Sequence, residues 1–251
     1  MFYMRLLRNV YQIAGPMYAV HQNVYAVKDG DSIIVIDTGK DEREFQVAQR
    51  NLKYWELDKY PISHVLLTHA HFEHSANAHR YYELGAQIVA HEIDAEGVEK
   101  GNDCTAAYAF TDCNKYVPCK VDLKVKDGDI IKPKSLEFEV IHVPGHSGGS
   151  VFYKLVSENK KILFTGDTVL TEKLCRESAL GWTGGVDYNQ NTYFQSLTKI
   201  STMTADVVLP GHGEVCMRDA GELMNGAYLK ARLLLMTKPS LNLMNENLFR
   251  N

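Results

Sequence analysis

Three histidines lie close together in the segment THAHFEHS, at positions 69, 71 and 74. His69 and His71 follow the apolar run HVLL and are two residues apart, so both side chains can turn toward one point, while His74 begins the helix expected next. Neutral imidazole is a common zinc ligand, and three imidazoles packed together without a cation are hard to justify electrostatically. The segment therefore predicts a metal site rather than three unrelated structural histidines.

Three later residues could complete such a site. His146 lies in VPGHSGGS, Asp167 in FTGDTV and His212 in VLPGHGE, each after a strand-like run. The carboxyl ends of strands are where ligand sites of α/β sheets gather. Taken alone, an aspartate after glycine is more often a turn or helix cap. The appearance of all three after the histidine segment favours metal binding.

The elements that must position these residues alternate between strands and helices. Apolar runs rich in β-branched residues, each bounded by Gly, Pro, Asp or Asn, predict strands at 23–27, 32–39, 64–69, 87–92, 136–143, 150–156 and 161–167. Apolar residues at spacings of three and four predict helices at 41–58, 75–85, 188–200 and 222–236. Turns are expected at 28–31 and 157–161, and an insertion near 93–120.

A strand-rich half, the insertion and a second strand-rich half indicate an α/β protein, in which two packed sheets with helices outside would account for the mixture. Periodicity alone does not choose this arrangement over other α/β folds. The 251 residues, 45% hydrophobic and 23% charged, fit one globular domain over 1–251. The helix near 222–236 would be its last element.

Charge and composition disfavour several other classes. The net charge of −4 comes without a concentrated basic stripe, which disfavours nucleic acid as a partner. The start of the chain lacks a signal-peptide pattern and the longest apolar runs are too short to span a bilayer, so we expect a cytoplasmic protein with no membrane partner. Five cysteines without a CxxC pair argue against a disulfide framework. Cys104, Cys113 and Cys119 are expected to be reduced, packed thiols rather than metal ligands.

The series HAHFEH, GHSGGS, TGDT and PGHG resembles the metallo-β-lactamase superfamily, whose signature is His-x-His-x-Asp-His followed by His, Asp and His. The resemblance runs from about residue 20 to 215 and includes the opening hairpin VYAVKDGDSIIVIDTG. It implies a four-layer αββα sandwich, with two mixed sheets inside and helices outside. The motifs are specific for the fold and much less so for a substrate.

The resemblance also implies the ligands. Carried over position by position, one metal is held by His69, His71 and His146. The second metal is held by His74 and His212, and Asp167 bridges the two. Glu73 stands where the family usually has aspartate, and it is expected to bind the second metal. Its longer arm leaves three outcomes open: a weakened second site, a preference for another metal, or a site rebuilt around glutamate.

The expected chemistry is hydrolysis. Two divalent cations, most readily Zn²⁺ with Mn²⁺ or Fe²⁺ as alternatives, would hold a bridging hydroxide that attacks a small ester, thioester, lactone or amide. Glu73 and Asp167 would be the catalytic carboxylates. Two other functions stay open: a mononuclear iron dioxygenase resembling the persulfide dioxygenases, and a non-catalytic binding protein on the same scaffold. The retention of His74 and His212 disfavours the first, and the absence of any outright ligand loss disfavours the second.

Residues around the expected ligands have two interpretations each. Asp37, in VIDTG, could hydrogen-bond the histidine loop or cap a turn. The segment 104–119 is either a lid or interface beside the metals or a surface excursion. Trp182 could face a substrate or pack, and Tyr193 is expected to pack. The partner is a small-molecule substrate, and self-association into a homo-oligomer stays open.

Overall fold

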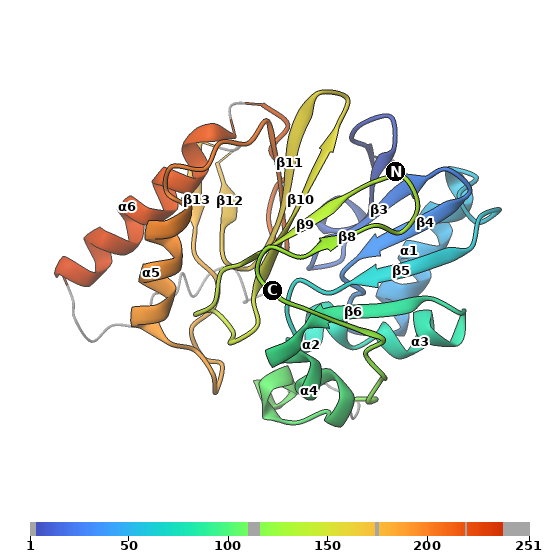
Figure 1. Cartoon of the computed structure of the whole chain (residues 1–251), viewed down its shortest axis with the longest axis horizontal. Coiled ribbons are helices and arrows are strands. Elements are labelled where there is room, and N and C mark those ends of the chain that lie inside the picture. Colours follow the sequence, from blue (N-terminus) through green and yellow to red (C-terminus); the bar gives the residue numbers. More distant parts are fainter. Residues whose placement is uncertain (1–3, 110–115, 174–175, 219, 238–251) are drawn as a thin grey trace.

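The computed structural model describes residues 4–109, 116–173, 176–218 and 220–237. Two main sheets face each other with helices on their outer sides (Figure 1). The first sheet runs in chain order through β1 (Met4–Arg5), β2 (Val10–Ala14), β3 (Val24–Asp29), β4 (Ser32–Ile36), β5 (Ile62–Leu66), β6 (Gln87–His91) and β7 (Leu123–Val125). Strands β1 to β4 pair antiparallel and β4 to β7 pair parallel, so this sheet is mixed.

The second sheet is mixed as well. Its order is β14 (Val207–Pro210), β11 (Lys160–Gly166), β10 (Val151–Ser157), β9 (Phe138–His142) and β8 (Ile130–Ile131). Only the β11–β14 pair is parallel. A separate ribbon pairs β12 (Leu170–Glu172) with β13 (Glu177–Ala179). The expected pair of mixed sheets is therefore confirmed.

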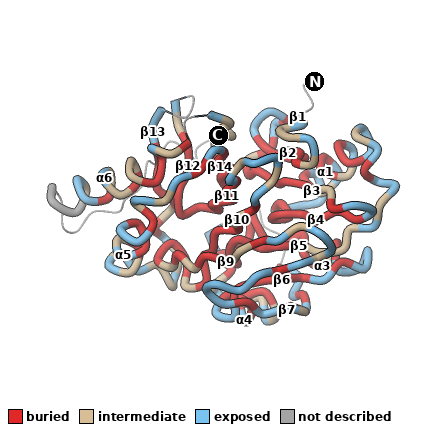
Figure 2. The backbone as a smooth tube through the Cα atoms, turned by 45° about the horizontal axis from the view of Figure 1, so that its top comes forward, coloured by how far each residue is buried: buried red, intermediate tan, exposed pale blue. Residues whose placement is uncertain are grey.

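Each strand of the first sheet divides its apolar side chains between two cores. In β4, Ile34 and Ile36 pack between the two sheets, while Ile33 and Val35 pack on the opposite face. The period of two along a strand produces this alternation, and a strand buried on both faces reads as a continuous apolar run. Figure 2 shows the buried backbone concentrated in both sheets, with exposed segments on the outer helices.

Helices complete the outer layers (Figure 1). The first sheet is covered by α1 (Glu42–Tyr54), α3 (Ala78–Glu83) and α4 (Glu92–Lys100), and the second by α5 (Gln190–Ile200) and α6 (Gly221–Thr237). Short turns of helix follow as α2 (Phe72–Ser75), η1 (Pro16–Tyr18), η2 (Asp103–Thr105) and η3 (Ala107–Ala109). None of the described helices is long and apolar enough to cross a membrane. The layers are helix, sheet, sheet, helix, as the family resemblance implied.

The seven expected strands and the two hairpin turns are present, with ends shifted by a few residues. The helix expected at 75–85 is observed as α3 (Ala78–Glu83), and the short α2 (Phe72–Ser75) precedes it, with Ala76 and Asn77 between the two. The insertion expected near 93–120 begins as α4, whose Ala95 and Val98 belong to the outer core of the first sheet. Residues 110–115 lie outside the described part, and Tyr116 beyond them is buried.

Candidate metal centre

The expected ligands come from separate segments that meet at one rim of the sandwich. Three of these segments follow strands: His69 follows β5, Asp167 follows β11, and His212 follows β14. Asp37, the candidate partner of the histidine loop, follows β4 at the same edge. His146 lies on the loop after β9. Because these strand ends gather at the same edge, residues far apart in the sequence come into contact, as His74 and His212 do across 138 positions.

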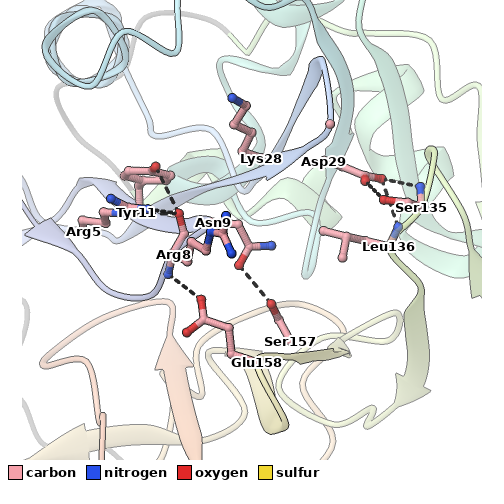
Figure 3. Close-up of a pocket in the computed structure, with 11 residues that line it drawn as sticks. Arg5, Arg8, Asn9, Tyr11, Lys28, Asp29, Ser135, Leu136, Ser157 and Glu158 are labelled. Carbon is pink, nitrogen blue, oxygen red and sulfur yellow. Dashed lines mark hydrogen bonds between the residues drawn. The ribbon is translucent and has the colours of Figure 1, made fainter.

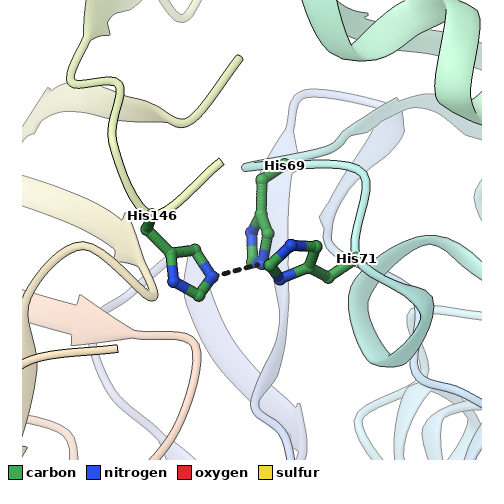
Figure 4. A group of neighbouring side chains, drawn as sticks. All are labelled: His69, His71 and His146. Carbon is green, nitrogen blue, oxygen red and sulfur yellow. Dashed lines mark hydrogen bonds between the residues drawn. The ribbon is translucent and has the colours of Figure 1, made fainter. Parts of the chain in front are cut away.

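A first group consists of His69, His71 and His146, all buried, with one ring nitrogen of each within 4.8 Å of the others. Figure 4 shows the three rings converging from two loops. The Nε2 atoms of His69 and His146 are 3.2 Å apart. The ring centroids of His71 and His146 are 4.6 Å apart. His69 and His71, two residues apart, thus turn their side chains toward one point, as expected from the sequence.

A second group consists of Glu73, His74, Asp167 and His212, again buried and within 4.8 Å of one another. Nε2 of His74 lies 3.2 Å from Nε2 of His212 and 3.4 Å from Oδ1 of Asp167. Asp167 Oδ2 is 3.4 Å from His212 and 3.9 Å from His146 of the first group. Asp167 therefore stands between the two groups.

The donor atoms fit a cation. Within the described chain, both ring nitrogens of His71 and Oε2 of Glu73 are buried without a hydrogen-bond partner. A buried polar atom without a partner is destabilising by about 1–3 kcal/mol, so such atoms in a native protein need an explanation. A metal ion at each group would bind one ring nitrogen of His71 and Oε2 of Glu73. We find that imidazole nitrogens and carboxylate oxygens, the ligands typical of zinc sites, are the atoms that converge here.

Electrostatics favour the ligand forms of most of these side chains. Burial lowers the pKa of His69 and His71 well below the ordinary histidine value, which keeps the imidazoles neutral and able to bind a cation. Burial alone would raise the pKa of Asp167, but His212 and His74 outweigh it and hold that pKa well below its usual range. Burial raises the pKa of Glu73 to about 7.

Hydrogen bonds on the far side of three rings fix their orientation. Nδ1 of His74 is 2.8 Å from Oδ2 of Asp37, and Nδ1 of His146 is 2.8 Å from the carbonyl of Trp182. Nδ1 of His69 is 3.0 Å from the hydroxyl of Thr68. When Nδ1 donates, Nε2 presents its lone pair to the centre, and such partners hold a metal-binding ring in place. Of the two interpretations of Asp37, the hydrogen bond to the histidine segment is present in the structure.

Several contributors were not predicted from the sequence. Asn23 donates to the carbonyls of Pro210 and Gly213 at 2.9 and 3.1 Å, which holds the loop that carries His212. A Cβ atom at Gly211 would collide with Oδ1 of Asp167, so only glycine fits beside the carboxylate. The sequence signal for this close approach is the first glycine of the PGHG motif.

The other residues singled out from the sequence have clear places. Tyr193 packs as expected: it is fully buried and its hydroxyl donates to the carbonyl of Thr168 at 2.6 Å. The Trp182 side chain is half-buried, with its ring centroid 6.0 Å from that of His71. Cys104 and Cys119 are free thiols, whereas Cys113 lies outside the described residues.

The described parts of 104–119 lie beside the site. The Tyr116 hydroxyl donates to Ser75 Oγ at 3.1 Å, on the short helix that carries Glu73 and His74. The Tyr108 hydroxyl donates to the carbonyl of Gly184 at 2.9 Å, next to the loop of Trp182. These contacts hold the described residues of the segment against α2 and the loop of Trp182.

A separate hollow opens between the two sheets at the hairpin end, away from the metal groups (Figure 3). Its lining includes Arg5, Arg8, Lys28 and Glu158. The guanidinium of Arg5 donates to nearby backbone carbonyls and Glu158 accepts from the backbone N–H of Arg8. None of the residues predicted to do chemistry lies here.

The sequence pattern of the metallo-beta-lactamase superfamily matches residues 17–212. The chain belongs to this superfamily. Among curated proteins, the atrochrysone carboxyl ACP thioesterase AgnL7 of Paecilomyces divaricatus is 26% identical over 91% of this chain and 62% of its own length. The acyl-coenzyme A thioesterase MBLAC2 of Homo sapiens is 26% identical over 76% of this chain and 72% of its own. The chain thus spans less than two thirds of the length of AgnL7.

Solved structures agree on the fold. The subclass B3 metallo-beta-lactamase BJP-1 of Bradyrhizobium japonicum superposes with a TM-score of 0.72, at 22% identity, over 90% of this chain and 89% of that one. The metallo-beta-lactamase family protein TTHA1429 of Thermus thermophilus superposes with a TM-score of 0.68, at 20% identity, over 92% of this chain and 82% of that one. The predicted four-layer architecture is confirmed.

Proposed function

We propose that this protein is a binuclear metal-dependent hydrolase that cleaves small acyl thioesters. The observation that carries the proposal is the presence of two adjacent buried ligand groups, with Asp167 within reach of both. The choice of a thioester among the expected substrates is supported by relatives named as an atrochrysone carboxyl ACP thioesterase and an acyl-coenzyme A thioesterase.

In the proposed centre, His69, His71 and His146 hold one divalent cation. Glu73, His74 and His212 hold the other, and Asp167 is shared. Zn²⁺ suits these nitrogen and oxygen donors best, with Mn²⁺ or Fe²⁺ as alternatives. When bound, the cations supply an activated water as nucleophile and polarise the acyl carbonyl.

The chain itself supplies orientation and a dry surrounding. Asp37 and the Trp182 carbonyl hold the rings of His74 and His146, so that the substrate meets a preformed centre. The ligand side chains are all buried, with at most 6% of any of them exposed. Charge–dipole interactions are stronger in such surroundings than in water, because the local dielectric constant is low.

An apolar rim beside the centre is suited to an acyl group. Ile93, Tyr108 and Val186 are each more than half exposed. Ile93 approaches the His146 loop, since a Cβ at Gly148 would lie 3.0 Å from its Cγ2 atom. With the Trp182 ring near His71, these side chains offer a surface that would bind hydrocarbon rather than a charged group.

The first test is the metal content of the purified protein, followed by hydrolysis of acyl-coenzyme A substrates. Thiol release is followed with a thiol reagent, against a blank without substrate because the chain has free cysteines of its own. About two zinc, manganese or iron ions per chain and metal-dependent thiol release would support the proposal.

Hydrolysis that survives complete removal of the metal would contradict it. About one iron per chain with oxygen uptake would instead indicate the mononuclear dioxygenase. The complete second group disfavours that alternative.

A further inference from the structure

A buried carboxylate outside the ligand set joins the two loops that carry the first group. Asp94, in the first turn of α4, is 1% exposed. Its Oδ2 atom accepts from the backbone N–H of Ala70 at 2.8 Å and from the Ser147 hydroxyl at 3.0 Å. Its Oδ1 atom accepts from the backbone N–H of Gly149 at 2.6 Å.

These donors stand next to the ligands in the sequence. Ala70 lies between His69 and His71, while Ser147 directly follows His146. One side chain therefore connects the backbone of the β5 loop to that of the β9 loop. This connection fixes how far apart the two loops lie. It therefore bears on the distance between Nε2 of His69 and Nε2 of His146, which is 3.2 Å.

Two glycines allow α4 and the Asp94 carboxylate to approach both loops closely. A Cβ atom at Gly149 would collide with the Asp94 carboxylate, so the close approach requires glycine. On the other side, Gly97 of α4 faces Ala70: a Cβ atom added at Gly97 would lie 3.5 Å from the Cβ of Ala70. Helix α4 thus packs directly on the histidine loop, and its carboxylate reaches across to the glycine-rich loop.

We propose that Asp94 is a positioning residue for the first metal group, a role that rests on the proposed metal centre. Both of its oxygens must be acceptors, because an N–H group faces each of them. Asparagine has the same size but one NH₂ group, which would face a backbone N–H and push one loop away. Partners that hold metal ligands in place typically change metal affinity by roughly 10–100-fold when altered.

The test compares Asp94→Asn with a matched control elsewhere in the chain. Asp29 is also 1% exposed. It accepts from the backbone N–H and the hydroxyl of Ser135 and from the backbone N–H of Leu136 (Figure 3). It closes the β3–β4 hairpin, at the end of β4 opposite to Asp37. For wild type, Asp94→Asn and Asp29→Asn we would measure Zn²⁺ affinity by competition with a chromophoric chelator, and thermal unfolding of the metal-free protein.

The expected result is roughly 10–100-fold weaker Zn²⁺ binding in Asp94→Asn and wild-type affinity in Asp29→Asn. Both variants should unfold at lower temperature when metal-free. Wild-type Zn²⁺ affinity in a folded Asp94→Asn protein would overturn the positioning role and leave the metal centre standing. A wild-type chain that binds no Zn²⁺, Mn²⁺ or Fe²⁺ would overturn the metal centre itself, and the role of Asp94 with it.

If Asp94→Asn does not fold, Ser147→Ala provides the same test in milder form. It removes one donor from the same carboxylate and leaves both backbone contacts in place. A several-fold loss of Zn²⁺ affinity is expected, and unchanged affinity would overturn the proposal.

Discussion

The carboxylate of Asp37 lies 2.8 Å from Nδ1 of His74, and its other oxygen accepts from the backbone N–H of Thr68 at 2.8 Å. One side chain at the end of β4 therefore holds both a ring of the second ligand group and the strand end that precedes His69. Asp37 has a φ of 59°, a left-handed conformation uncommon outside glycine, which aims its side chain at this point.

Replacing Asp37 with asparagine should weaken metal binding by roughly 10–100-fold and lower turnover. The asparagine oxygen can keep the Thr68 contact, but its NH₂ group then faces Nδ1 of His74. The imidazole would respond by moving its proton to Nε2, where the metal should bind. Metal affinity and kcat of the purified variant are the measurements. Wild-type values for both would show that Asp37 only shapes the β4 turn.

Asp167→Ala and His71→Ala should each abolish metal-dependent hydrolysis while the fold survives. Asp167 approaches both ligand groups, and both ring nitrogens of His71 lack a hydrogen-bond partner among the described residues. Activity, metal content and circular dichroism are compared with His64→Ala, a histidine half-buried on β5 and outside both groups. Full activity in Asp167→Ala would exclude the shared-carboxylate centre.

The sequence predicted which candidate ligands would lie together, because motif and fold agree there. His69, His71, His146, Asp167 and His212 each follow a strand-like run, so a sheet that gathers strand ends brings them together. The strands of the two cores were equally visible, since β4 and β10 are nearly continuous apolar runs. Periodicity and strand ends thus carried most of the prediction.

What the sequence did not reveal depends on contacts between distant segments. The start of the insertion expected near 93–120 forms α4, whose Ala95 and Val98 are buried in the outer core of the first sheet. The short strands β1, β7 and β8 have two or three residues each, which is too few for a recognisable alternation. Asp94 carries no motif of its own, because its contacts are with backbone N–H groups and one serine hydroxyl of other loops.

Glu73→Asp tests the departure from the family pattern. If Glu73 binds the second cation, the shorter arm should change affinity at that site or the pH dependence of turnover. Glu73 Oε2 is buried without a hydrogen-bond partner in the part of the chain that the structure describes, which leaves it available to a cation. Sequential metal binding, measured by calorimetry, separates the two sites. A variant with both binding steps and the pH profile unchanged would show that Glu73 is not a ligand.

Glu44 should make the protein less stable as the pH rises. This side chain on α1 is 3% exposed, and its burial raises the pKa of the carboxyl to about 7. Because the folded-state pKa lies above the unfolded value near 4.5, the folded protein binds more protons between these values. The contribution of Glu44 to the free energy of unfolding therefore falls by about 3 kcal/mol as the pH increases from about 4.5 to 7, and it is constant above that pH.

Glu44→Gln should remove this slope. Its amide oxygen can still accept from the backbone N–H of Lys40 and from the Gln22 amide, but it never ionises. Urea unfolding of the metal-free proteins at pH 5, 6 and 8 would show the variant gaining stability relative to wild type as the pH rises. Glu83→Gln, an exposed position on α3, is the control and should track wild type at every pH. A constant difference between Glu44→Gln and wild type would mean that the carboxyl does not titrate in this range.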